Sequence, residues 1–204
     1  MIRKQIWPAV GMTLALCVLT GGIYPAVVTG VAQTLFPRQA NGSLVSVNGR
    51  IVGSALIGQP FTRPEYFHPR PSGAGTGYDA SASSGTNLGP TSRKLADTLV
   101  AQAVADVVAN DGVEKGQIPS DMVTSSGSGL DPDVTPANAQ LQVGRVARAR
   151  HVDSTRLRAL VDAHTQGRQF GFFGEPRVNV LLLNIAVDST FGAPKPLPPA
   201  PTKP

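Results

Sequence analysis

Cysteine, histidine and aromatic residues are all scarce in this chain of 204 residues. The single cysteine, Cys17, lies inside an apolar segment, so the remaining chain has no thiol for a disulfide, a metal or nucleophilic catalysis. His68, His151 and His164 are far apart, without a second ligand at the spacing typical of zinc sites. We therefore expect no metal site, and a body that folds without covalent cross-links.

Charged residues are absent between Gln5 and Pro37, where Leu, Val, Ile and Ala predominate. Roughly 20 apolar residues in a helix suffice to cross a hydrocarbon core of about 30 Å. The composition therefore predicts a transmembrane helix at residues 6–31, preceded by a short segment at residues 1–5. A cleaved secretory signal is the alternative, and we disfavour it because the apolar run is longer than the core of a signal peptide.

The charge distribution does not favour nucleic acid as a partner. The formal net charge is +5, but Arg3 and Lys4 precede the apolar segment, and the 16 basic residues after it exceed the 13 acidic residues by only three. No basic stripe with interleaved aromatic side chains concentrates this charge. Because Arg38 and Arg50 follow the apolar segment, the bias toward a cytoplasmic amino terminus is slight.

Turn and helix signals divide the body that follows. Asn48-Gly49 between apolar pairs predicts a hairpin at residues 43–54, and the proline-rich stretch at 58–90 predicts a long irregular loop. Cap and spacing signals predict three helices, which run from about Ser92 to Gly112, from Thr135 to Arg150 and from Asp153 or Ser154 to Gly167. The apolar run 178–187 fits a buried strand and a buried helix equally well. The predicted fold class is a single N-terminal transmembrane helix followed by a mixed α+β domain.

Serine and glycine alternate in the stretch SSGSGLDP at residues 125–132. Such a run is either a phosphate cradle or a demanding turn in which Gly127 and Gly129 adopt positive φ. A phosphate loop has a lysine and a hydroxyl after its second glycine, whereas Leu130 and Asp131 stand here, and the carboxylate would repel a phosphate. The turn is the better interpretation.

A catalytic reading of the same stretch is the alternative function. A free-standing extracytoplasmic serine hydrolase would use Ser128 as nucleophile, with His164 and Asp131 as partners. Ser128 lacks the GxSxG context of a nucleophile elbow, so we expect no catalytic residue. Arg177 and Asn179, at the entry to the apolar run 178–187, are expected to hold an internal polar network.

Six motifs follow the apolar segment in a fixed order. They are GSALIGQPF at 53–61, YFHPRPS at 66–72, SSGTNLGPTS at 83–92, VTSSGSGLDPDVTP at 123–136, QVGRVARAR at 142–150 and FGEPRVNVLLLNIAVD at 173–188. Together they closely resemble the C subunit of the Kdp potassium-transporting P-type ATPase, the KdpC family, over residues 5–190.

The resemblance implies a noncatalytic accessory subunit of an ATP-driven, high-affinity potassium uptake complex in the bacterial plasma membrane. Its partners would be a channel-like KdpA subunit that conducts K⁺, a KdpB subunit that hydrolyses ATP and a small KdpF peptide, and it would support their assembly. A cytoplasmic amino terminus, an extracytoplasmic domain at residues 38–191 and a chaperone role that raises the ATP affinity of KdpB are also implied. The candidate ATP contact is the serine–glycine run, which comprises Ser125, Ser126, Gly127, Ser128 and Gly129.

Two features depart from the family pattern. Asp133 stands where the GLDPH pattern of the family has a histidine, so any role of that imidazole does not carry over. The tail at residues 192–204 has six prolines in thirteen residues, extends past the usual family end and is expected to be disordered.

We also expect the acidic side chains of Glu65, Asp79 and Asp131 to bias cations toward the ion entrance.

Overall fold

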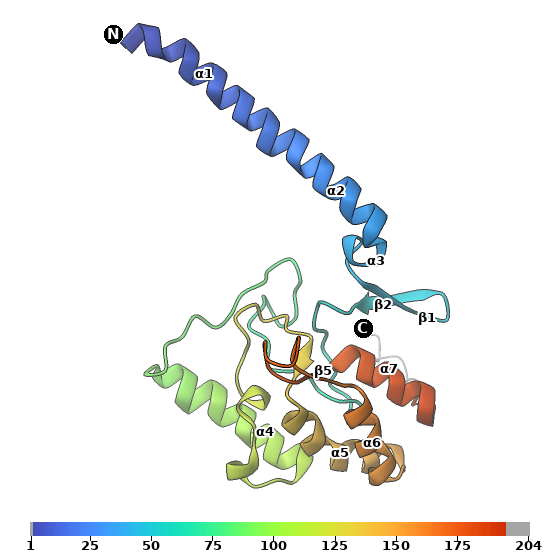
Figure 1. The fold of residues 1–204 in the computed structure, drawn as a ribbon. Helices are drawn as coiled ribbons and strands as arrows, with labels where there is room; N and C mark the ends of the chain where they lie inside the picture. The colour runs from blue at the N-terminus through green and yellow to red at the C-terminus, as the bar shows by residue number, and fades with distance from the viewer. Residues whose placement is uncertain (1, 195–204) are drawn as a thin grey trace, which may run out of the picture. The chain divides into compact units, whose positions relative to one another are not determined.

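The computed structural model describes residues 2–194, which fall into two compact units along the chain (Figure 1). The boundary between the units lies between Ser54 and Ala55. Residues 195–204, which make up most of the tail for which disorder is predicted, lie outside the described residues.

The first unit begins with one long helical rod. It consists of α1 at Ile2–Val18, a π-helical turn η1 at Leu19–Ile23 and α2 at Tyr24–Leu35. From Arg3 to Leu35 the rod is long and apolar enough to cross a membrane, as the composition predicts. Pro25 has no N–H and its ring crowds the preceding turn, so the extra residue in η1 gives the proline room without breaking the rod.

A short helix and a β-hairpin complete the first unit. Helix α3 spans Pro37–Ala40, and strands β1 (Leu44–Val47) and β2 (Arg50–Ser54) pair antiparallel. Asn48 and Gly49 have φ angles of 51° and 77°, which the tight turn between the strands requires. The predicted hairpin is therefore confirmed.

Three helices of the second unit enclose an apolar core. They are α5 (Pro136–Arg150), α6 (Ser154–Ala163) and α7 (Val180–Phe191). Their fully buried side chains form one cluster with Phe67, and α5 contributes Ala139, Val143 and Val146 to it. Residues spaced by three and four lie on one face of a helix, so this face of α5 is apolar throughout.

The predicted first helix of the body is present with an unusual start. A π-helical segment η2 (Lys94–Val100) leads into α4 (Ala101–Asp111), which ends at Gly112 with a φ of 71°. Two 3₁₀ turns follow, η3 at Lys115–Gln117 and η4 at Ser120–Met122. The glycine exit predicted at Gly112 is confirmed, because the left-handed conformation there suits a residue without Cβ.

A small antiparallel sheet joins distant parts of the second unit. Its strands β3 (Asp133–Val134), β4 (Thr165–Gln166) and β5 (Arg177–Asn179) have the order β3-β5-β4. The predicted continuation of the third helix to Gly167 is wrong, since Thr165 and Gln166 leave the helix to pair with β5. Both interpretations of the apolar run 178–187 apply in part.

That run changes from strand to helix at Asn179. Val178 is the central, fully buried residue of β5, and its neighbour Asn179 accepts a hydrogen bond from Leu182 N at 3.1 Å. A side-chain oxygen that binds the free amide of the first turn starts a helix, and α7 accordingly begins at Val180.

The proline-rich stretch around Phe67 is held by side chains instead of a neighbouring strand. Asn184 of α7 accepts from Phe67 N at 2.8 Å and donates to Phe67 O at 3.0 Å. Gln142 of α5 accepts from His68 N at 2.7 Å and donates to His68 O at 2.9 Å. Two amide side chains thus pair with consecutive peptide units much as a strand would.

Candidate functional site

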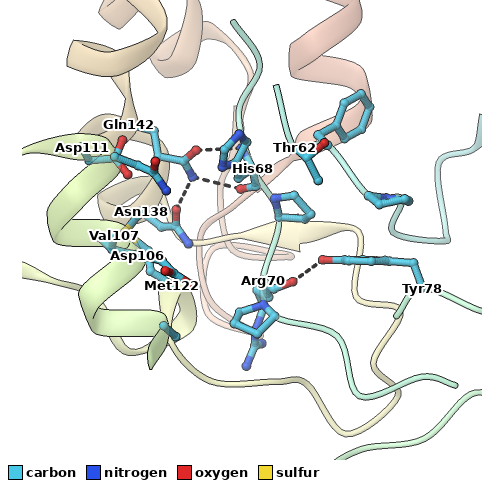
Figure 2. A pocket seen from close by; sticks show the side chains of 16 residues that line it. Thr62, His68, Arg70, Tyr78, Asp106, Val107, Asp111, Met122, Asn138 and Gln142 are labelled. Carbon is cyan, nitrogen blue, oxygen red and sulfur yellow. Dashed lines mark hydrogen bonds between the residues drawn. The ribbon is translucent and has the colours of Figure 1, made fainter. Parts of the chain in front are cut away.

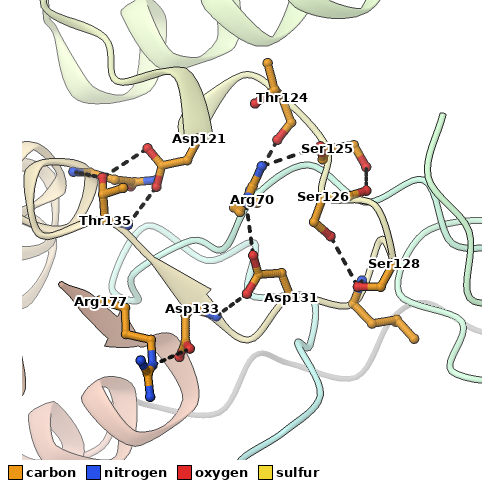
Figure 3. A network of polar contacts seen from close by, with 12 residues as sticks. Arg70, Asp121, Thr124, Ser125, Ser126, Ser128, Asp131, Asp133, Thr135 and Arg177 are labelled. Atoms are coloured by element: carbon orange, nitrogen blue, oxygen red, sulfur yellow. Dashed lines mark hydrogen bonds and ion pairs between the residues drawn. The ribbon is translucent and has the colours of Figure 1, made fainter. Parts of the chain in front are cut away.

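The serine–glycine loop, residues 125–129, is fixed against other irregular segments of the body (Figure 3). Ser128 O accepts a hydrogen bond from Ser84 N at 3.0 Å. Gly129 O accepts one from the Ser72 hydroxyl at 2.6 Å. Ser72 and Ser84 lie in two different parts of the irregular chain before α4. The loop is therefore hydrogen-bonded to two other irregular segments.

Only one of the two glycine positions in this loop requires a residue without Cβ. Gly129 has a φ of 67°, and a Cβ there would lie 2.5 Å from Ser84 O and 2.6 Å from Ala74 N. At Gly127 an added Cβ would meet nothing within 4 Å, and its φ is not in the left-handed region. The predicted positive φ is therefore confirmed for Gly129 and wrong for Gly127.

The hydroxyl of Ser128 is not set up as a nucleophile. It accepts a hydrogen bond from Leu130 N at 3.1 Å, as in a local serine turn. His164 bonds instead through Nδ1 to Leu160 O, at 2.9 Å, in the last turn of α6. Among residues 2–194 no histidine is hydrogen-bonded to Ser128, so the geometry gives the serine hydrolase alternative no support.

Arg70 forms hydrogen bonds with residues on both flanks of the loop. Its guanidinium bonds to the Asp131 carboxylate at 3.0 Å and to Thr124 O at 3.4 Å (Figure 3). The other oxygen of Asp131 accepts from Asp133 N at 3.0 Å. The Arg70 guanidinium beside the loop is thus already paired with Asp131. A phosphate that bound here would have to compete with that carboxylate. The candidate ATP contact at residues 125–129 stays a prediction.

Asp133 links β3 to β5. Its carboxylate lies 3.1 Å from Arg177 Nε (Figure 3). It also accepts a hydrogen bond from Asn179 Nδ2 at 3.2 Å. Burial raises the pKa of Asp133, and the charge of Arg177 opposes that shift. The internal polar network predicted at Arg177 and Asn179 is confirmed.

The acidic side chains expected to steer cations are engaged within the body. Glu65 pairs with Arg63 at 2.8 Å, and this hydrogen bond lowers the pKa of Glu65. Asp131 pairs with Arg70, as described above. Asp79 accepts from the amide and hydroxyl of one nearby serine, at 2.9 and 2.6 Å. Two of the three carboxylates are therefore paired with arginine, and the steering role stays a prediction.

A cavity of about 440 Å³ lies between helices α4 and α5 on one side and the proline-rich stretch on the other (Figure 2). Phe61, Pro69 and Val107 contribute apolar surface to it. Tyr78 donates a hydrogen bond to Arg70 O, and burial raises the pKa of Tyr78. Within the described residues no buried side-chain nitrogen or oxygen lacks a hydrogen-bond partner. The buried polar groups of the cavity wall are therefore satisfied within the protein.

Two buried amide side chains line the cavity and are hydrogen-bonded to each other and to a buried carboxylate. Gln142 donates to Asn138 at 2.7 Å (Figure 2). Asn138 in turn donates to Asp121 at 3.0 Å. Asp121 also accepts from Thr135 N at 2.7 Å, so it ties η4 to the start of α5. The Thr135 hydroxyl caps that helix, as predicted. Gln142, Asn138 and Asp121 were not identified from the sequence. No distinctive spacing in the sequence connects two amides on a helix with a carboxylate in a preceding turn.

Arg145 is buried, with 5% of its surface exposed. It pairs with Asp111 at 2.9 Å and donates to the carbonyls of Pro64 and Tyr66, at 2.8 Å each. Its guanidinium binds the proline-rich stretch across the core, where five fixed donors can satisfy several acceptors at once.

His68 lies beside this arginine. Burial is the main cause that lowers the pKa of His68, and the charge of Arg145 adds to it. The ring nitrogen Nε2 is 3.0 Å from Arg63 O. In the part of the chain that the structure describes, no three His, Cys, Asp or Glu side chains form a group that could hold a metal ion.

Comparison with known proteins decides the family. The family described as "KdpC: K+-transporting ATPase, c chain" matches residues 6–189. The chain belongs to the KdpC family. The potassium-transporting ATPase KdpC subunits of Gemmatimonas aurantiaca, Koribacter versatilis and Rhodospirillum rubrum are 60%, 55% and 54% identical to it. These alignments cover 92%, 96% and 92% of this chain and 94%, 100% and 97% of the relatives, so the resemblance seen in the six motifs is confirmed.

Proposed function

We propose that this chain is a noncatalytic accessory subunit of an ATP-driven potassium uptake complex in the bacterial plasma membrane. The observation that carries the proposal is the family match over residues 6–189, which includes the long apolar helix and the body together. The proposed partners are a channel-like subunit that conducts K⁺, a subunit that hydrolyses ATP and a small membrane peptide. The role of the chain is to support their assembly.

The proposed anchor is the rod from Arg3 to Leu35. Its 33 residues extend about 50 Å at 1.5 Å per residue, more than the roughly 30 Å of a hydrocarbon core. Leu14, Gly21, Gly22 and Ala26 line an apolar hollow on this rod. Small residues let helices approach closely in lipid, where close packing drives association. We infer that helices of the partner subunits pack here.

The proposed topology has a cytoplasmic amino terminus and the body outside. With this topology the serine–glycine loop cannot touch ATP in the cytoplasm. A rise in the ATP affinity of the partner, if this chain causes it, would then act through contacts with that partner. Assembly is for this reason the primary role that we propose.

Coexpression tests the assembly role. The tagged chain is produced together with the three proposed partners and purified in a mild detergent. We expect all of them to copurify, and potassium-limited growth to depend on this chain. Recovery of the tagged chain alone, from cells in which the partners form a complex without it, would show that the proposal is wrong.

A single cysteine tests the topology. Gly127 is exposed and an added Cβ there meets nothing, so Gly127→Cys in a Cys17→Ser background should fold normally. We expect a membrane-impermeant thiol reagent to label it in intact cells. Labelling only in inside-out vesicles would reverse the proposed orientation and make direct contact with ATP feasible again.

A further inference from the structure

The chain between β4 and β5 forms a hairpin arm with an aromatic tip. Gln169 and Phe173 exchange two backbone hydrogen bonds of 2.8 and 2.9 Å, which close a three-residue turn, Phe170-Gly171-Phe172. Arg168 and Glu175 form an ion pair of 2.6 Å across the arm. The turn is thus fixed by backbone and ionic contacts rather than by burial.

The three phenylalanines of this arm are strongly exposed. Phe170, Phe172 and Phe173 have 88%, 64% and 57% of their surface accessible, whereas Phe67 in the core has none. The rings of Phe172 and Phe173 lie 4.1 Å apart, so they form a contiguous apolar patch. Contiguous exposed patches of this kind mark sites of interaction. We refer to these three side chains as the aromatic tip.

The backbone at Phe170 is strained. Its φ of 53° is in the left-handed region, which a bulky aromatic residue rarely occupies and a glycine occupies freely. The ring is also the most exposed of the three, so it contributes no packing that would offset this strain within the body. Strain that local packing does not repay points to a contact beyond the body.

The chemistry of the aromatic tip favours a protein over a lipid surface. Segments that bind membrane surfaces combine apolar side chains with unpaired Lys or Arg that attract anionic headgroups. Here the basic side chain nearest to the tip in sequence, Arg168, is paired with Glu175, so the arm is close to neutral. Rigid aromatic side chains beside a polar pair are typical of the anchors of protein interfaces.

We propose that the aromatic tip, Phe170, Phe172 and Phe173, inserts into an apolar pocket of a neighbouring protein subunit of the potassium-transporting ATPase. The inference rests on the proposed function, since it assumes that this chain assembles with such a subunit. It assigns the arm at residues 168–175 as a contact of that assembly, in addition to the apolar helix.

The first test separates assembly from stability. Phe170→Gly removes the ring and relieves the backbone strain, so the purified chain should unfold at the same or a higher temperature. Its apparent Kd for the partner complex, titrated in detergent, should rise at least about tenfold, as for other aromatic anchors. Leu99→Ala, which trims an apolar side chain that is 39% exposed on η2, should leave the Kd unchanged.

The outcomes distinguish the inference from the function on which it rests. If the unaltered chain binds the partners and Phe170→Gly binds equally well, the inference alone is wrong. If the unaltered chain does not bind them, the proposed function fails first. A fall in unfolding temperature for Phe170→Gly would show that the ring serves the body, which would also overturn the inference.

The second test asks whether the occupant is lipid. Trp7 is the single tryptophan of the chain, so Phe170→Trp in a Trp7→Phe background places one fluorescent reporter in the tip. In vesicles of phosphatidylethanolamine and phosphatidylglycerol, the emission should be that of an indole in water, and it should shift to shorter wavelength when the partners are added. Quenching by brominated lipid, with or without partners, would instead assign the tip to the membrane.

Discussion

Arg150 reaches from the last turn of α5 to the proline-rich stretch and to the carboxyl end of α7. It donates to Glu65 O at 2.6 Å, to the Asp188 carboxylate at 2.7 Å and to Gly192 O at 2.9 Å. Its guanidinium also lies 4.9 Å from the centre of the Tyr66 ring. Single polar side chains of α5 and α7 thus hold an irregular stretch that has no strand partner. Some of the basic residues that give the body its positive charge, such as Arg150, therefore make contacts within the body.

Asn184 provides the sharpest test of this kind of contact. It is 1% exposed and satisfies both the N–H and the C=O of Phe67. Asn184→Leu keeps the number and branching of the side-chain heavy atoms but leaves two buried peptide groups unpaired, so the free energy of unfolding should fall by about 2–4 kcal/mol. Thr190→Ala, an exposed change on the same helix, is the matched control. Urea unfolding in detergent, followed by circular dichroism, would measure both, and equal midpoints would contradict the argument.

His68 makes stability depend on pH. Its pKa is lowered in the folded state by burial and by Arg145, so the unfolded chain takes up a proton more readily than the folded chain. The stabilising contribution is present above the ordinary value of 6.5 and is lost as the pH falls through the lower, folded pKa. The unfolding free energy should therefore fall with pH below about 6.5. His68→Gln should flatten this slope, whereas His151→Asn, which removes an exposed imidazole, should leave it in place.

At the scale of elements, the serine–glycine loop acts as a joint whose fit depends on one glycine. Gly129→Ala would bring a Cβ within 2.6 Å of two backbone atoms at positive φ, so it should destabilise the body by about 2 kcal/mol or more. Gly127→Ala has open space and should change the stability by less than about 0.5 kcal/mol. Thermal unfolding of the two variants side by side checks the difference. Equal effects would mean that the loop can move away from its neighbours.

Local signals in the sequence predicted much of this architecture. The Thr135 cap, the exit at Gly112 and the hairpin at Asn48-Gly49 each depend on residues within one turn of one another, and each is confirmed. The end of α6 was mispredicted because β4 forms only through pairing with β5, a partner that is distant in sequence. Propensity cannot reveal such pairing, since tertiary contacts override it.

The site was less predictable than the elements, for the same reason. The roles of Gln142, Arg145 and Asn184 come from backbone groups more than 70 residues away, which no spacing rule connects to them. Arg177 and Asn179 were predicted correctly because polar residues at the edge of a buried run must find partners nearby. The positive φ expected at Gly127 was wrong, since composition alone does not say which glycine of a loop carries the turn.

At the scale of the whole molecule, the chain combines an exposed apolar rod with a body that satisfies its own polar groups. Within the described residues the body has no buried polar side chain without a partner and no cluster of metal ligands. The exposed apolar surfaces of the chain include the rod from Arg3 to Leu35 and the aromatic tip, Phe170, Phe172 and Phe173. This combination fits a subunit that acts by binding other proteins, and it places the informative experiments on assembly.

The carboxyl end offers a test of where the functional molecule stops. A chain that ends after Pro194 keeps Asp188, Phe191 and the Gly192 carbonyl that binds Arg150, and the family match already ends at residue 189. We therefore expect unchanged unfolding and unchanged copurification with the partners. A chain that ends after Val187 loses the carboxylate that pairs with the buried Arg150 side chain, so it should lose more than about 3 kcal/mol of stability. Loss of partner binding in the chain that ends after Pro194, with normal unfolding, would instead assign the proline-rich tail a role of its own in assembly.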